Sequence, residues 1–128
     1  MTKPPSDYHI SAYGTKEDRD KLVHSEDVGV LRNIVRHGHV DHLDALVNHP
    51  NDGIRMEVAI NGHPHHHDIL ASDTNKLVRM KVAVHGNDEH VNYLKDDHDE
   101  DVRKLAHDEM DERKLTRSIF PEFKKKGR

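Results

Sequence analysis

A 24-residue repeat runs through most of this chain of 128 residues. Residues 30–38, 54–62 and 78–86 begin 24 positions apart, and each carries aliphatic residues at its first and fifth positions and a glycine at its ninth. Residues 102–110 continue the pattern, with Met110 in the place of the glycine. A period of this length is typical of an array of similar units, because each unit can bury its apolar face only against its neighbours.

The frame extends in both directions, so we expect a five-unit array over residues 6–118. Ile10 and Gly14 fall in the aliphatic and glycine columns, which makes the N-terminal segment a divergent first unit. Residues 1–5 are predicted to be an N-terminal extension, and residues 119–128 a C-terminal cap and basic tail.

Each unit is predicted to form a helix, a turn, a shorter helix and a second turn. Val78 and Val82 lie one helical turn apart, and the glycine that follows is expected to take the left-handed conformation that often ends a helix. The second element has apolar residues at helical spacing, as in Leu43 and Leu46, and Pro64 suits the first position of such a helix. No window shows the alternation of a strand, so the predicted fold class is all-α.

The pattern Val/Ile-Arg-x-x-Val-Ala-x-x-Gly, followed by a leucine-bearing short helix and an Asp-rich turn, resembles the leucine-rich repeat variant family. That family is a 24-residue relative of HEAT-type solenoids, so the resemblance implies a right-handed α-solenoid of about five repeats. The founding members carry a cysteine-ligated iron–sulfur element, which this cysteine-free chain cannot hold, and x-Gly replaces their usual Asn-Pro after the first helix. The resemblance therefore implies a fold and carries over no activity.

Composition limits the classes of function. The formal net charge is −4 with histidine neutral, so the chain lacks the global basic field of most nucleic-acid binders. The N-terminus has no apolar signal segment, and no run is long enough to span a membrane, so we expect a cytoplasmic protein without membrane contact. A P-loop, a nucleotide-binding fingerprint and a His-Glu-x-x-His motif are all missing, so we predict a non-enzyme that uses no cofactor.

Arginines recur at the second position of three units, as Arg55, Arg79 and Arg103. They could form a basic ladder for phosphate groups. Alternatively, each arginine could hold the acidic turn beside it by charge-assisted hydrogen bonds. The many carboxylates in the turns would cancel a field that attracts phosphate, which favours the intramolecular ladder.

Histidine is abundant, with 14 in the chain, and four stand at the start of one short helix: His63, His65, His66 and His67. His63 with His66 or His67 has the spacing of a helical metal-binding pair, to which Asp68 could add an oxygen. Two histidines fall short of a structural zinc site, so no metal site is predicted. Protonated histidines at a helix start would face the positive end of the helix dipole and repel one another, so stability is expected to fall between pH 7 and pH 5.

A further histidine column contains His42, His66 and His90, one in each of three successive units. We expect it to form a solvated ridge.

The third and seventh positions of each unit form a stripe beside the core. They supply the predicted partner-binding residues, which are Arg32, Arg36, Met56, Ile60, Met80, Val84 and Lys104. In one interpretation the stripe packs on the short helix of its own unit. In the other it is an exposed methionine-rich patch rimmed by basic residues, as on an adaptable binding surface.

These features predict a non-catalytic binding module or small adaptor for a protein partner. The alternative is a HEAT-like protein that binds nucleic acid through basic residues of the first helices. Continuous positive charge along the first helices would favour the alternative, whereas an apolar centre would favour a protein partner.

The C-terminal residues are expected to close the last apolar face of the array. Ile119, Phe120 and Phe123 are the candidates for this cap, and Lys124 to Lys126 form a basic end.

Overall fold

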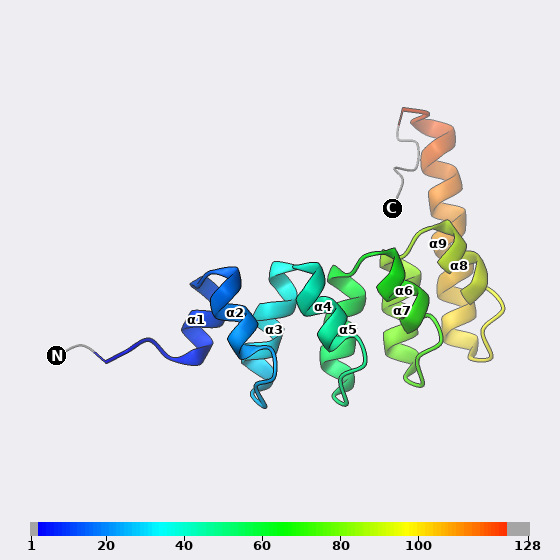
Figure 1. Cartoon of the computed structure of the whole chain (residues 1–128). Helices are drawn as coiled ribbons and strands as arrows, with labels where there is room; N and C mark the ends of the chain where they lie inside the picture. Colours follow the sequence, from blue (N-terminus) through cyan, green and yellow to red (C-terminus); the bar gives the residue numbers. More distant parts are fainter. Residues whose placement is uncertain (1–2, 123–128) are drawn as a thin grey trace.

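The computed structural model describes residues 3–122, and this part of the chain is helical and contains no strand (Figure 1). The prediction of an all-α protein is confirmed. In chain order the helices are α1 (Asp7–Tyr13), α2 (Lys16–Leu22), α3 (Val28–His37), α4 (Val40–Leu46), α5 (Asp52–Asn61), α6 (Pro64–Leu70), α7 (Lys76–His85), α8 (Asp88–Leu94) and α9 (Glu100–Ile119).

The helices form two layers, and both layers run along the length of the molecule (Figure 1). The first helices of the units, α1, α3, α5, α7 and α9, pack side by side in that order. Each of the short helices α2, α4, α6 and α8 packs against the first helix before it and the first helix after it. The aliphatic columns of both layers are buried, as at Ile34, Val58 and Val82 in the first layer and Leu46 and Leu70 in the second. The core therefore lies between the layers along the whole row.

From the second unit onwards, each first helix begins at a capping residue in the same position of the unit. These residues are Asp27, Asn51, Asn75 and Asp99, and each accepts hydrogen bonds from backbone N–H groups of the first helical turn. The side-chain oxygen of Asp27, for example, accepts from the N–H of Val30 at 3.1 Å. Because such caps satisfy otherwise unpaired donors, the repeat encodes the start of every first helix locally.

The glycines that end the first helices differ from the prediction. Only Gly38 is left-handed among the described residues, with φ of 71°, whereas Gly62 and Gly86 are extended, with φ of −80° and −75°. A Cβ atom on Gly62 would lie 2.6 Å from the carbonyl oxygen of Val58 and 3.0 Å from the Cβ of His66. Glycine is needed at this turn because there is no room for a side chain, and the left-handed prediction holds for Gly38 alone.

The fifth unit lacks the expected break between its helices. Met110 stands where glycine ends the earlier first helices, and α9, which is 20 residues long, continues past it to Ile119. Its C-terminal part runs past the end of α7 (Figure 1). A side chain at this position cannot follow the tight path seen at Gly62, so the helix propagates instead. No helix within residues 3–122 is both long and apolar enough to cross a membrane.

Ile119 and Phe120, which were expected in the hydrophobic cap, are 57% and 46% exposed. Phe123 lies outside the described residues, so the cap stays a prediction. Polar contacts of α9 are seen at the end of the row. The guanidinium of Arg113 donates to the carboxylate of Asp88 at 3.1 Å and to the carbonyl of Val84 at 3.2 Å, so it covers the C-terminal end of α7.

Candidate functional site

Arg79 is 4% exposed and joins two successive turns. Its Nε and Nη2 atoms donate to the carboxylate of Asp97 at 2.8 and 3.2 Å, and its Nη1 donates to the carbonyl of Asp73 at 2.6 Å. Arg55 binds the carboxylate of Asp73 with the same geometry one unit earlier, and this hydrogen bonding raises the pKa of Arg55. These guanidinium groups are occupied within the protein, as the intramolecular ladder predicts.

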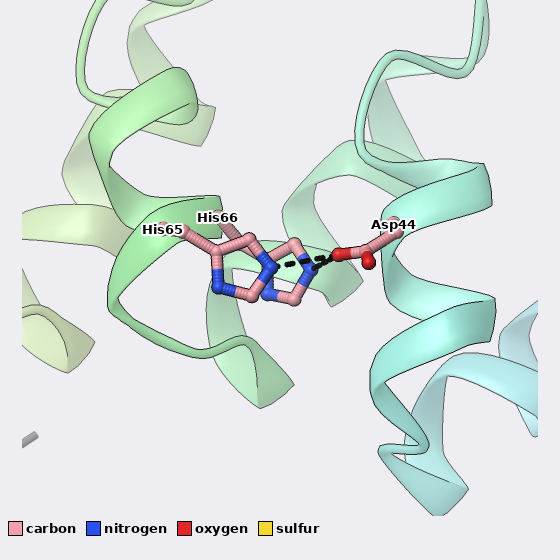
Figure 2. A group of neighbouring side chains, drawn as sticks. All are labelled: Asp44, His65 and His66. Atoms are coloured by element: carbon pink, nitrogen blue, oxygen red, sulfur yellow. Dashed lines mark hydrogen bonds and ion pairs between the residues drawn. The ribbon is translucent and has the colours of Figure 1, made fainter.

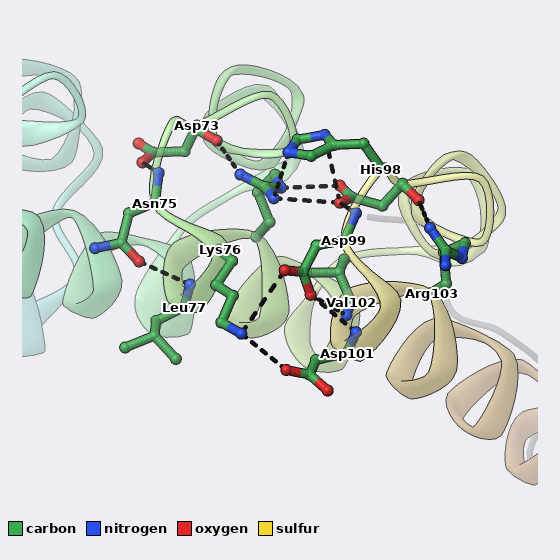
Figure 3. Close-up of polar contacts among 11 residues, drawn as sticks. Asp73, Asn75, Lys76, Leu77, His98, Asp99, Asp101, Val102 and Arg103 are labelled. Carbon is green, nitrogen blue, oxygen red and sulfur yellow. Dashed lines mark hydrogen bonds and ion pairs between the residues drawn. The ribbon is translucent and has the colours of Figure 1, made fainter.

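Arg103 ends the ladder. Its Nη1 donates to the carbonyl of Asp97 at 2.8 Å (Figure 3). On the same side of the molecule, Figure 3 shows Lys76 of α7 reaching the carboxylates of Asp99 and Asp101 at the start of α9. The cations along the turns are therefore engaged within the protein, Arg79 by the turn that closes its own unit and Lys76 by acidic groups at the start of α9.

Part of the predicted partner-binding stripe lines a shallow hollow of about 370 Å³ on the first-helix layer. The residues of this apolar groove are Met56 of α5, Leu77, Met80, Lys81 and Val84 of α7, and Leu105 of α9. Leu77 and Val84 are 48% and 42% exposed. Ile60 is half-buried and is not part of the lining. The structure thus brings three units together at one apolar surface.

The floor of the apolar groove follows from helical periodicity. Leu77, Met80, Lys81 and Val84 have the spacing i, i+3, i+4 and i+7, so they share one face of α7. Met56 and Leu105 contribute from the neighbouring helices α5 and α9, which pack on either side of α7. Met56, Met80 and Leu105 also pack against the core, whereas Leu77 and Val84 face outward.

Lys81 lines the groove and is exposed, and Lys104 of α9 is also exposed but is not part of the lining. Within the described residues, neither Lys81 nor Lys104 forms an ion pair. Lys104 occupies the unit position of Met80, and Asp108 occupies that of Val84, so the apolar pair is not continued on α9. The unpaired positive charge in the lining of the groove therefore comes from Lys81.

The predicted basic residues of the second unit are arranged differently. Arg32 and Arg36 of α3 both reach the same carboxylate oxygen of Glu57 on α5, at 3.5 and 3.0 Å. Glu57 therefore interrupts the positive charge between α3 and the apolar groove.

Leu77 and Leu105 are groove residues that the sequence reasoning did not select. Leu77 occupies the last position of its unit, where Gly29, Gly53 and Asp101 stand in other units. A leucine in a column of turn residues was the signal that could have revealed it. Leu105 lies one position after the stripe, where the other units carry polar residues.

The histidine column is buried, so the prediction of a solvated ridge is wrong. His42, His66 and His90 are 2%, 0% and 6% exposed. Each occupies the third position of a short helix, and its side chain turns back over the helix start towards the preceding unit. There its Nε2 meets a carboxylate oxygen at 2.6 to 2.7 Å, and the carboxylates of the three pairs belong to Asp20, Asp44 and Asp68.

The hydrogen bonds of His66 define its tautomer. Its Nδ1 accepts from the backbone N–H of His63 at 2.9 Å, so this atom carries no proton. The Nε2 therefore carries the proton and donates to Asp44 at 2.7 Å. His90 makes the equivalent pair of contacts with the N–H of Asn87 and with Asp68. These histidines cap a helix start and join two units at once.

Asp44, His65 and His66 form a compact group whose ligand atoms all lie within 4.8 Å of one another (Figure 2). A metal ion would need the lone pair of the His66 Nε2, and a neutral ring would then place a proton on Nδ1, opposite the donating N–H of His63. Metal-bound imidazoles normally donate through their other nitrogen. The group is therefore organised for hydrogen bonding, and its donor set does not fit a metal ion.

Burial lowers the pKa of His66, and this effect exceeds the opposing effect of the hydrogen bond that His66 donates to Asp44. The hydrogen bonds from His65 and His66 lower the pKa of the Asp44 carboxyl. The fourth histidine of the helix start, His67, points elsewhere, because its Nε2 donates to the carbonyl of Ala59 at 2.7 Å.

No protein-family model, no curated protein and no solved structure matches this chain.

Proposed function

We propose that this protein is a non-catalytic binding module whose apolar groove holds an acidic, amphipathic helix of a protein partner. In this proposal the two-layered row is a right-handed α-solenoid of the HEAT-like, leucine-rich repeat variant type. Such arrays expose extended surfaces built from successive units. The apolar groove is composed of residues from three units.

The observation that carries the proposal is the combination of an apolar floor with unpaired lysines. Leu77 and Val84 are large, exposed aliphatic residues on one helical face, and methionines beside them can adapt to different side chains. Arg79 is paired with Asp97 and Lys76 with Asp99, whereas Lys81 of the groove and Lys104 of α9 form no ion pair within the described residues. A partner with apolar residues for the floor and carboxylates for these lysines would satisfy both features.

The shape of the groove favours a helix as the occupant. The groove residues from Leu77 to Val84 cover eight residues of α7, or about 10 Å for seven rises of 1.5 Å. This length matches about two turns of a partner helix, whose residues at i, i+3, i+4 and i+7 would form the apolar contact. Met56 and Leu105 would contact such a helix on its two sides.

Nucleic-acid binding has less support. The basic residues needed for a continuous phosphate-binding surface include Arg32 and Arg36, and both are engaged by Glu57. The surface between them and Lys104 is apolar at its centre. Phosphate binding relies on several unpaired cations in one field.

The test uses three helix-stabilised peptides of about 14 residues with one apolar stripe and a polar face of glutamate, glutamine or lysine. Fluorescence anisotropy should show that the glutamate peptide binds at least about tenfold more tightly than the lysine peptide. Leu77→Glu should abolish this binding, because it places a carboxylate in the apolar floor. Lys81→Glu should remove the preference for the acidic peptide.

Ile69→Glu is the matched control, since Ile69 is 45% exposed on a short helix outside the groove. This variant should bind the glutamate peptide like the wild type. Equal binding of all three peptides, or unchanged binding by Leu77→Glu, would contradict the proposal. Tight binding of a single-stranded oligonucleotide with a steep salt dependence would favour the nucleic-acid alternative.

A further inference from the structure

His66 connects three parts of the molecule through one buried imidazole. It belongs to α6, its Nδ1 accepts from the N–H at the start of that helix, and its Nε2 donates to Asp44 of α4. Its Cβ also packs at the Gly62 turn that follows α5. A neutral ring with its proton on Nε2 satisfies all of these contacts, whereas a doubly protonated ring cannot accept from His63.

The groups that face His66 act in opposite directions. Asp44 favours a charged imidazole, but this carboxylate is itself 52% exposed and shared with His65. The ring of His65 lies 3.9 Å from that of His66, and the ring of His63 lies 5.7 Å away, so protonation of either neighbour would repel a charge on His66. Complete burial of the His66 side chain also opposes that charge.

We propose that His66 makes the joint between the second and third units sensitive to acid. When His66 takes a second proton, the hydrogen bond that caps α6 is lost and a charge is placed in the buried joint. The start of α6 then opens away from α4, and the row is weakened at this point.

The direction of the pH dependence follows from the lowered pKa of His66. The unfolded chain binds the proton near the ordinary value of 6.5, while the folded protein binds it only at lower pH. Below 6.5 the unfolded state therefore carries more protons, and the stability falls as the pH falls. The contribution of His66 to the stability is fully present at pH values well above 6.5. Titration of Asp44 affects the stability only at pH values below this window, because the pKa of its carboxyl is lowered from 3.8.

The experiment is a thermal melt series of the full chain between pH 7 and pH 5. The melting temperature of the wild type should fall by about 4 °C or more. His66→Asn should flatten this dependence, since a short amide oxygen can still accept from the helix start, as the carboxylate of Asp18 does at the same position of α2. Asp44→Asn should steepen it, because it removes the charge that favours protonated His66 while keeping an acceptor for Nε2–H.

A second measurement on the wild type keeps the test independent of how well the variants fold. Nitrogen NMR of the imidazoles should show the Nε2–H tautomer for His66 at pH 7. Amide exchange, corrected for intrinsic rates, should increase at the start of α6 as the pH falls to 5. The proposal is overturned if His66→Asn keeps the wild-type slope, if Asp44→Asn flattens it, or if the NMR shows a proton on Nδ1 at pH 7. Because none of these readouts uses a partner, their result is separate from that of the peptide test.

Discussion

Arg79 illustrates how single residues connect the units of this protein. Its guanidinium satisfies the carboxylate of Asp97 in the following turn and a carbonyl in the preceding turn, and both side chains of the pair are about 5% exposed. A planar group with several donors can hold two turns at once, which a lysine cannot do. The repeated arginine is therefore explained by structure.

Replacement of Arg79 by alanine should destabilise the protein strongly, because the buried carboxylate of Asp97 would lose its partner. We expect a loss of about 3–5 kcal/mol in the free energy of unfolding. Arg103→Ala is the matched control, since Arg103 makes a single bond to a carbonyl, and should cost about 1 kcal/mol. Urea denaturation of both variants measures the difference, and equal losses would show that the ladder does not depend on the bidentate contact.

At the scale of the elements, the turn between the two helices of a unit exists in two forms. In the third unit Gly62 is extended and His66 accepts from the helix start, whereas in the second unit Gly38 is left-handed. The Nδ1 atom of His42 then has no hydrogen-bond partner within the described residues. The glycine column thus serves close packing in one unit and backbone conformation in another.

The two forms of the turn predict losses of stability of different size for the same substitution. Gly38→Asn should change stability by less than about 1 kcal/mol, because asparagine tolerates the left-handed conformation and a Cβ at Gly38 meets no atom within 4 Å. Gly62→Asn should cost about 1–3 kcal/mol, because its Cβ would overlap the carbonyl of Val58. Thermal or chemical denaturation tests this, and a Gly38 variant as damaging as the Gly62 variant would contradict the distinction.

At the scale of the whole molecule, the C-terminal end of the row is closed by α9. The guanidinium groups of Arg113 and Arg117 on α9 both donate to the carboxylate of Asp88 at the start of α8. Arg113 also donates to backbone carbonyls at the end of α7. The apolar residues beyond them, Ile119 and Phe120, remain exposed. The polar contacts of Arg113 and Arg117 therefore join α9 to the two helices before it.

The importance of this polar closure can be tested by comparing two replacements on α9. Arg113→Ala should lower the free energy of unfolding by about 1–2 kcal/mol, because it removes charge-assisted hydrogen bonds to Asp88 and to the end of α7. The double replacement Ile119→Ser with Phe120→Ser should change it by less than about 0.5 kcal/mol, as is usual for exposed positions. If the double replacement lowers the free energy of unfolding more than Arg113→Ala does, the result would support the predicted hydrophobic cap.

The sequence alone determined the helical class, the 24-residue period and the aliphatic core columns, and it favoured the pairing of the arginines with acidic turns. These features depend on residues within one unit or on charges that recur with its period, so one chain reveals them. Tertiary structure decided which faces of the units are covered. His42, His66 and His90 look like surface residues by type, but each is buried with its ring bonded to a carboxylate about one unit earlier in the chain. The rings of His66 and His90 also accept a hydrogen bond from a helix start.

The groove and the end of the row were also decided in three dimensions. Met56, Leu77 and Leu105 come from three helices, and only the packing of α5, α7 and α9 brings them to one surface. The long α9 depended on a single difference, Met110 for glycine, whose effect follows from the lack of space for a Cβ at the equivalent turns. Periodicity shows which positions are equivalent, but the atoms that neighbouring units place around them determine whether they are exposed, buried or bonded.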